Sequence, residues 1–118
     1  MRLRILLLVS VAALATASIA GSMTVPKLFG TVGPAFTISL KDAKGKAVKQ
    51  LKAGKYTFVI RDKSSIHTFS LKGPGINKTL TSVAFVGSKS VTLTLRTGTY
   101  TFYCAVHPTT MRGTFKAT

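Results

Sequence analysis

Residues 91–104, Val-Thr-Leu-Thr-Leu-Arg-Thr-Gly-Thr-Tyr-Thr-Phe-Tyr-Cys, decide the fold class of this chain. Apolar side chains alternate with threonines along 91–95, turn residues follow at 96–98, and the alternation resumes along 99–104. Because strand side chains point to opposite faces in turn, this alternation predicts β-strands and not helices. The stretch therefore predicts two strands joined by a short turn, with Tyr100, Phe102 and Cys104 on one face.

The same pattern extends outward from this stretch. Phe36, Ile38 and Leu40 alternate with polar residues, which predicts a shared apolar face, and a second alternating run covers 56–60. Gly113 begins a short terminal strand that is expected to reach Thr118, whereas the Gly- and Pro-containing segment 72–78 is predicted to be a loop. No segment of useful length has a helical period. We therefore predict an all-β fold, a Greek-key β-sandwich or barrel.

The first twenty residues have the organisation of a secretory signal peptide. Arg2 and Arg4 precede an apolar run from Ile5 to Leu14, and the small-residue stretch 15–20 follows. The alternative is a retained membrane anchor, but the apolar run is shorter than the roughly 20 residues that span a bilayer. We expect a signal peptide at 1–20 and one domain at 21–118, exported to the periplasm, the medium or the cell surface.

The composition limits the chemistry that the chain can perform. Its 118 residues include 17 Lys and Arg against 2 Asp and Glu, a net charge of +15. Removal of residues 1–20 leaves a net charge of +13. The composition excludes an acidic disordered tail and a collagen-like repeat. The single cysteine, Cys104, cannot form an internal disulfide, so in an exported protein it pairs with another chain, lies buried and inert, or binds a metal.

The strand alternation places the groups that could bind a metal. His67 shares a predicted face with Phe69 and Leu71, and Cys104 shares one with Tyr100 and Phe102, so both are expected to face the interior. His107 follows Cys104 by three positions, and Met111 follows four positions later. Two imidazoles, a thiolate and a thioether are the donor set that holds copper in electron-transfer sites, whereas zinc has little use for the thioether. Taken singly, a residue of each of these types is more often a structural side chain than a metal ligand, and it is their combination that points to a metal.

The Cys104 segment resembles the plastocyanin and azurin family of blue copper proteins, the cupredoxins. In that family an aromatic strand leads into Cys-x-x-His, a Met follows, and a Gly begins the last strand, as do Phe102-Tyr103-Cys104, His107, Met111 and Gly113 here. The resemblance covers roughly residues 25–118. It implies one type 1 copper with His67, Cys104 and His107 as equatorial ligands and Met111 as the axial ligand. The chain departs from the family in carrying Thr68 after the first histidine, where Asn is common, and in a ligand loop of intermediate length.

These observations predict a small exported protein that carries single electrons and has no catalytic residues. Multicopper enzymes need further histidines for a second copper centre, and a Cys-His hydrolase needs an accessible thiolate. A copper storage or delivery protein is the alternative, and a metal-free adhesion-like sandwich is a third reading.

The charge and the family resemblance also predict partners. A strongly basic protein favours acidic redox partners and is attracted to anionic cell envelopes. An exported chain without a groove-reading motif is not expected to bind nucleic acid, and we expect a monomer. The expected contact surface for partners is a small apolar patch formed by Gly33, Pro34, Pro74, Ile76, Ala105, Val106 and Pro108, around the edge of His107.

Overall fold

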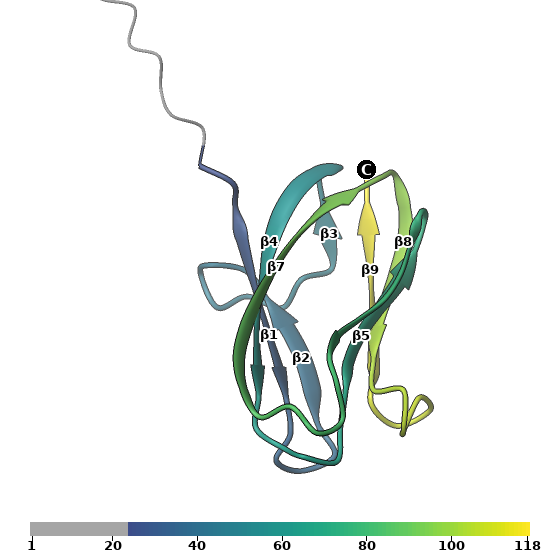
Figure 1. Ribbon diagram of the computed structural model, residues 1–118. Helices are drawn as coiled ribbons and strands as arrows, with labels where there is room; N and C mark the ends of the chain where they lie inside the picture. The colour runs from purple at the N-terminus through teal and green to yellow at the C-terminus, as the bar shows by residue number, and fades with distance from the viewer. Residues whose placement is uncertain (1–23) are drawn as a thin grey trace, which may run out of the picture.

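The computed structural model describes residues 24–118, so the predicted signal peptide at 1–20 lies outside the described residues. The described residues form nine strands and no helix (Figure 1). The strands are β1 (Lys27–Val32), β2 (Ile38–Lys41), β3 (Gln50–Leu51), β4 (Gly54–Asp62), β5 (Phe69–Gly73), β6 (Ile76–Thr81), β7 (Gly87–Leu95), β8 (Gly98–Tyr103) and β9 (Arg112–Ala117). Within residues 24–118, no helix is long and apolar enough to span a membrane.

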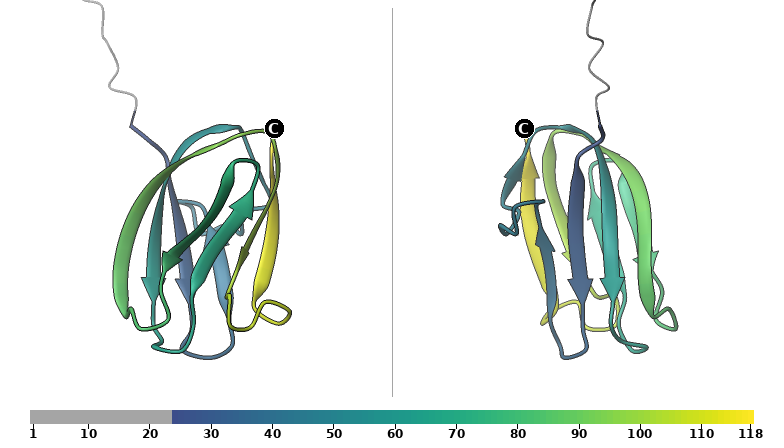
Figure 2. Two further views of the ribbon diagram at one scale, coloured as in Figure 1. Left: turned by 45° about the vertical axis from the view of Figure 1, so that its right-hand side comes forward. Right: turned by 90° about the vertical axis from the view of Figure 1, so that its left-hand side faces the viewer.

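The strands form two sheets that pack face to face. One sheet has the order β2-β1-β4-β7 and the other the order β3-β9-β8-β5-β6. The pairs β1/β4 and β3/β9 are parallel and the remaining pairs are antiparallel. Figure 2 shows the two layers from two further directions. The predicted all-β sandwich is therefore confirmed.

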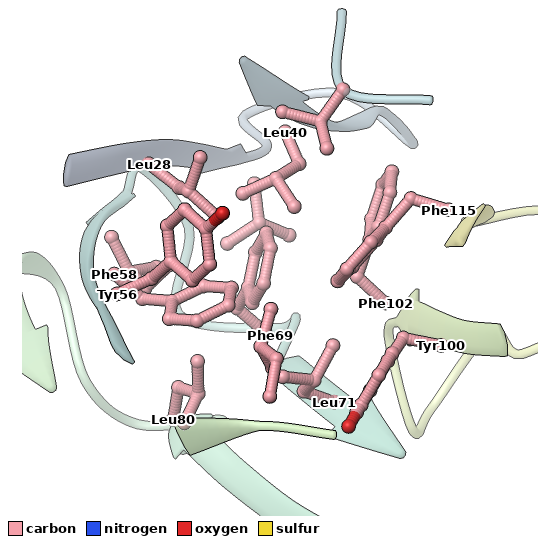
Figure 3. Packing of buried hydrophobic residues seen from close by; sticks show 14 of the residues in the cluster. Leu28, Leu40, Tyr56, Phe58, Phe69, Leu71, Leu80, Tyr100, Phe102 and Phe115 are labelled. Atoms are coloured by element: carbon pink, nitrogen blue, oxygen red, sulfur yellow. The ribbon is translucent and has the colours of Figure 1, made fainter. Parts of the chain in front are cut away.

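Aromatic and aliphatic side chains from both sheets fill the space between the layers (Figure 3). Tyr100 and Phe102 alternate inward along β8 as predicted, and Tyr100 is fully buried. The ring of Phe102 stacks on Phe69 at 5.9 Å between ring centroids, and the ring of Tyr100 stacks on Phe115 at 5.3 Å. These stacked pairs hold β5, β8 and β9 together, because the rings bury apolar area and also prefer a defined relative orientation.

Glycines let these rings lie directly against neighbouring strands. A Cβ atom at Gly113 would collide with the Phe102 ring, and one at Gly73 would collide with the Tyr100 ring. At Gly30 on β1, a Cβ atom would lie 2.6 Å from Cδ1 of Ile60 and 2.7 Å from Cε2 of Phe69. The inward positions of these glycines are therefore filled by the side chains of other residues.

Two sequence predictions about local structure are wrong. Segment 72–78 is not a loop, because Gly73 and Ile76 face each other as the last pair of the β5–β6 hairpin, and only Pro74 and Gly75 form the turn. Gly75 has a φ of +70°, a conformation that glycine adopts without steric cost. Phe36 does not share a buried face with Leu40, since its side chain is 61% exposed, in the loop before β2.

Four loops meet at one end of the sandwich, which we call the loop end. They are residues 33–37, 63–68, 82–86 and 104–111. In the first sheet Val32, Asp62 and Gly87 are register partners at this end. In the second sheet Tyr103 and Arg112 are partners at the corresponding positions. In Figure 1 these loops lie together at the lower end, opposite the C-terminus.

Candidate metal centre

Three of the four predicted ligands converge at the loop end. His67 lies just before β5, Cys104 follows β8 directly, and His107 lies in the loop between β8 and β9. One donor atom from each lies within 4.8 Å of the others. His67 and Cys104 are fully buried, whereas His107 is partly exposed. The inward orientation expected for His67 and Cys104 is therefore confirmed.

The donor atoms are spaced for one shared metal ion. The Sγ atom of Cys104 lies 3.8 Å from Nδ1 of His67 and 3.8 Å from Nδ1 of His107. Metal bonds of about 2.0 Å to nitrogen and about 2.3 Å to sulfur, at an angle near 120°, separate the two donors by about 3.7 Å. The two N–S separations therefore match a trigonal arrangement of two imidazoles and one thiolate around a central ion.

Backbone hydrogen bonds close the loop that carries Cys104, His107 and Met111. The N–H of Cys104 donates to the carbonyl of Met111 at 2.9 Å, and the N–H of Met111 donates to the carbonyl of His107 at 2.9 Å. The N–H of His107 donates to the carbonyl of Cys104 at 3.1 Å. Met111 is 1% exposed, so its thioether is enclosed at the base of the loop. The loop is a tight, hydrogen-bonded structure held by the ends of β8 and β9.

Thr68 ties the His67 segment to the Cys104 segment. Its backbone N–H donates to Sγ of Cys104 at 3.3 Å, and its Oγ1 accepts the N–H of Ala105 at 2.8 Å. The same hydroxyl is 3.0 Å from Oγ of Ser70. The residue that departs from the family pattern thus joins the two ligand segments through its hydroxyl. Thr68 and Ser70 are both buried, and this chain of hydroxyl contacts satisfies their hydrogen-bonding groups.

Phe36 covers the two histidines from the outside. Its ring lies edge-on to His67 at 5.3 Å and to His107 at 4.9 Å between ring centroids, and the two imidazoles are 5.1 Å apart. This contact does not follow from the sequence pattern, because the alternation after Ala35 predicts a buried position for Phe36. The aromatic ring now separates the imidazoles from bulk water on one side.

The predicted apolar contact patch requires one correction. Pro74 and Ile76 lie at the opposite end of the sandwich, where the carbonyl of Pro74 accepts a hydrogen bond from the Tyr100 hydroxyl beside the β7–β8 turn. Gly33 does lie at the loop end, since a Cβ atom there would be 3.4 Å from Cδ2 of His67. The large exposed apolar side chains in the loops of this end are Phe36, Ile66, Val83, Val86 and Val106.

Comparison with known proteins supports the fold. No protein-family model matches the sequence, and no curated protein matches it. A crystal structure of rusticyanin variants is 24% identical with a TM-score of 0.52, covering 78% of this chain and 76% of that chain. The NMR structure of reduced rusticyanin is 20% identical with a TM-score of 0.54 and the same coverage, 78% and 76%. A chain of a haem-copper terminal oxidase dimer is 15% identical with a TM-score of 0.55, and the match covers 78% of this chain but 63% of the oxidase chain.

The two sheets and these structural neighbours define the class: the chain has the cupredoxin fold. Its donor set, two imidazoles and a buried thiolate with Met111 closing the same loop, fits a single type 1 copper.

Proposed function

We propose that this protein is a small exported blue copper protein that carries single electrons between redox partners. His67, Cys104 and His107 are the equatorial ligands in this proposal, and Met111 is the axial ligand. The observation that carries it is the position of both Nδ1 atoms 3.8 Å from the buried thiol sulfur. With Met111 as a fourth ligand beside the three clustered donors, the site would have no open position for a substrate, which favours an electron carrier over an enzyme.

Copper bound here would supply a one-electron couple, because sulfur donors favour Cu(I) and imidazoles serve both oxidation states. The residues of the chain hold the donors in place. The Thr68 N–H donates to the Cys104 sulfur and so withdraws electron density from the thiolate, a contact that tunes the potential of such sites. Burial of Cys104 and the ring of Phe36 exclude water from the donors. The donor side chains would therefore move little when bound copper changed its charge.

The partly exposed ring of His107 is the proposed point at which electrons enter and leave. Phe36 is in contact with its ring, and the adjacent residue Val106 is 51% exposed, so apolar side chains lie beside it. Small interfaces of this kind suit redox partners, which bind briefly and release quickly. His107 is the one donor residue of the three that reaches the surface among the described residues.

The proposed partners are acidic redox proteins. Asp62 is 1% exposed, so Asp42 is left as the only acidic side chain at the described surface.

A second path for electrons, besides the His107 ring, runs through the peptide bond from Cys104 to Tyr103, whose side chain lies on the outer face of the second sheet. Nζ of Lys72 lies 4.8 Å from the centre of the Tyr103 ring, and Arg112 on β9 is the register partner of Tyr103. Acidic partners would be attracted to both positions.

One group of lysines lies away from the loop end. Six exposed lysines lie along the chain from the end of β2 to the start of β4, and register partners such as Lys55 and Thr94 place them toward the opposite end. They are Lys41, Lys44, Lys46, Lys49, Lys52 and Lys55. We therefore propose that these lysines attract the protein to anionic cell envelopes and that electron exchange takes place at the loop end.

An absorption spectrum of the copper-loaded protein tests the proposed function. We expect an intense band near roughly 600 nm that disappears when ascorbate reduces the copper. Cys104→Ser should abolish the band, while His107→Gly should perturb it and leave the unfolding transition intact. Stoichiometric but colourless Cu(I) binding would favour the storage or delivery alternative. A protein that binds no stoichiometric copper would refute both.

Export is tested separately, by N-terminal sequencing of the protein recovered from a secreting host. Cleavage after Ala20 or Ala17 would agree with the signal peptide proposed for 1–20. An intact N-terminus in a membrane fraction would instead support the retained anchor.

A further inference from the structure

Two buried polar side-chain atoms in residues 24–118 have no hydrogen-bond partner among the described residues. They are Oδ2 of Asp62 and Nε2 of His67. Asp62 is 1% exposed and His67 is fully buried, so neither atom faces bulk water. Native proteins satisfy nearly all buried polar groups, and those left over call for a physical explanation.

The residues that carry the two atoms belong to one segment of the loop end, 62–67, which lies against Gly33. The other carboxylate oxygen of Asp62 accepts the N–H of Ser64 at 3.1 Å. The N–H of Lys63 donates to the carbonyl of Val32 at 2.9 Å, which holds this segment against the end of β1. A Cβ atom on Gly33 would lie 2.7 Å from Cβ of Ser64 and 3.4 Å from Cδ2 of His67. Because Cδ2 is bonded to Nε2, the Nε2 edge of the imidazole is the edge that borders Gly33 and Ser64.

The chemistry of the two atoms is complementary. Nδ1 of His67 faces the Cys104 sulfur and is the nitrogen that would bind the metal, and a nitrogen that binds a metal carries no proton. The neutral imidazole then carries its proton on Nε2, which becomes a buried donor that needs an acceptor. The Asp62 carboxylate offers a buried acceptor oxygen that needs a donor. A single water placed between them would accept the Nε2–H and donate to Oδ2, which gives it the two polar partners that a buried water needs at the least.

We propose that Asp62 is a positioning residue for the copper ligand His67 and that its Oδ2 accepts the Nε2–H through one bridging water. The inference rests on the proposed function. The carboxylate fixes the tautomer and the orientation of the ring, and it raises the basicity of the ligating nitrogen. A more basic ligand and a buried negative charge both favour Cu(II), so Asp62 lowers the reduction potential of the site.

The chain offers a matched control, because Asp42 is its only other acidic residue. Asp42 lies in the turn after β2, where Oδ1 accepts the N–H groups of Lys44 and Lys46 at 2.9 and 3.0 Å. Asp62→Asn and Asp42→Asn change the net charge equally, but only the first is next to the site. We expect Asp62→Asn to raise the reduction potential well above that of Asp42→Asn and to weaken Cu(II) binding about tenfold. Equal shifts in both variants would overturn the proposal.

A measurement on the metal-free full-length protein separates this inference from the copper proposal. In the wild-type protein, nitrogen-15 NMR should show His67 protonated on Nε2, with slow exchange of that proton and a cross-peak to a bound water. In Asp62→Asn the exchange should be faster, and in Asp42→Asn it should be unchanged. If wild-type His67 is protonated on Nδ1, or if its Nε2–H exchanges equally fast in both variants, Asp62 does not position the ring. Failure to bind copper with the NMR results as expected would refute the function and leave the positioning role standing.

Discussion

Gly113→Ala tests the packing that holds the ligand loop. Gly113 is the register partner of Phe102 on the neighbouring strand, and a Cβ atom there would collide with Cζ and both Cε atoms of the Phe102 ring. The ring cannot retreat freely, because Phe69 is stacked on it at an interplanar angle of 6°. The added methyl group must therefore displace the ring, the strand or both.

The magnitude follows from two opposing effects. Overpacking a well-filled core costs about 1–3 kcal/mol, and the rigid stack places this position toward the upper part of that range. Replacing a glycine in a strand returns about 0.5–1 kcal/mol by reducing the entropy of the unfolded chain. Overpacking is the larger effect, so we expect a net loss of about 1–2 kcal/mol in the free energy of unfolding. For a domain of this size, that lowers Tm by roughly 4–16 °C.

Urea unfolding of the metal-free protein measures this loss without a contribution from metal binding. Phe102→Leu is the companion variant, because it removes the ring atoms with which the new methyl group collides. In that background Gly113→Ala should be neutral or should stabilise the protein by up to about 1 kcal/mol. The coupling between the two positions should then be about 2 kcal/mol. If Gly113→Ala has the same effect in both backgrounds to within about 0.5 kcal/mol, the steric reasoning is wrong.

Three further outcomes are expected. Phe36→Ala should change the free energy of unfolding by less than about 0.5 kcal/mol, because the side chain is 61% exposed, yet it should increase the rate at which EDTA removes copper. An unchanged rate of copper loss would contradict the shielding role of Phe36. Thr68→Val should lower the free energy of unfolding by about 1 kcal/mol and shift the visible spectrum, whereas Thr68→Ser, which keeps the hydroxyl that accepts the N–H of Ala105, should preserve the spectrum. Identical spectra for both variants would show that this hydrogen bond does not hold the site. The rate of electron transfer to the anionic complex hexacyanoferrate(III) should fall as salt rises from about 10 to 150 mM, because the Debye length shrinks from about 30 to 8 Å. A rate insensitive to salt would remove the argument for acidic partners.

The period-two pattern was sufficient to predict the core strands and the orientation of two ligands. Tyr100, Phe102 and Cys104 face inward as their alternation indicates, and His67 shares the buried face of Phe69. These predictions succeed because a strand with one buried face must place its apolar side chains on that face.

The alternation of apolar and polar residues fails to predict a strand where a glycine stands at an inward position and side chains from other strands fill the space. Strand β1 was not predicted, because Gly30 takes an inward position that Phe69 and Ile60 fill, while Phe29 points outward and is 39% exposed. The pattern predicts a loop in place of the β5–β6 hairpin, because Pro74 and Gly75 are turn residues that occur both in loops and at the ends of tight hairpins. The packing at Gly30 depends on side chains from distant strands, which the local sequence does not specify.

The donor geometry is set by the sheets more than by the residues of the ligand loop. Cys104 continues β8 and Met111 precedes β9, and the hydrogen bond between their backbones extends the ladder that Phe102 and Gly113 hold in register. The segment that carries His67 is joined to the end of this ladder by hydrogen bonds from Thr68 to Cys104 and from Ala105 to Thr68. The described side chains between the donors are largely exposed, so the distance from sulfur to either imidazole depends on strand packing about two residues away from the site. A site built in this way keeps its shape when the charge at its centre changes by one electron, and this is the property that an electron carrier needs.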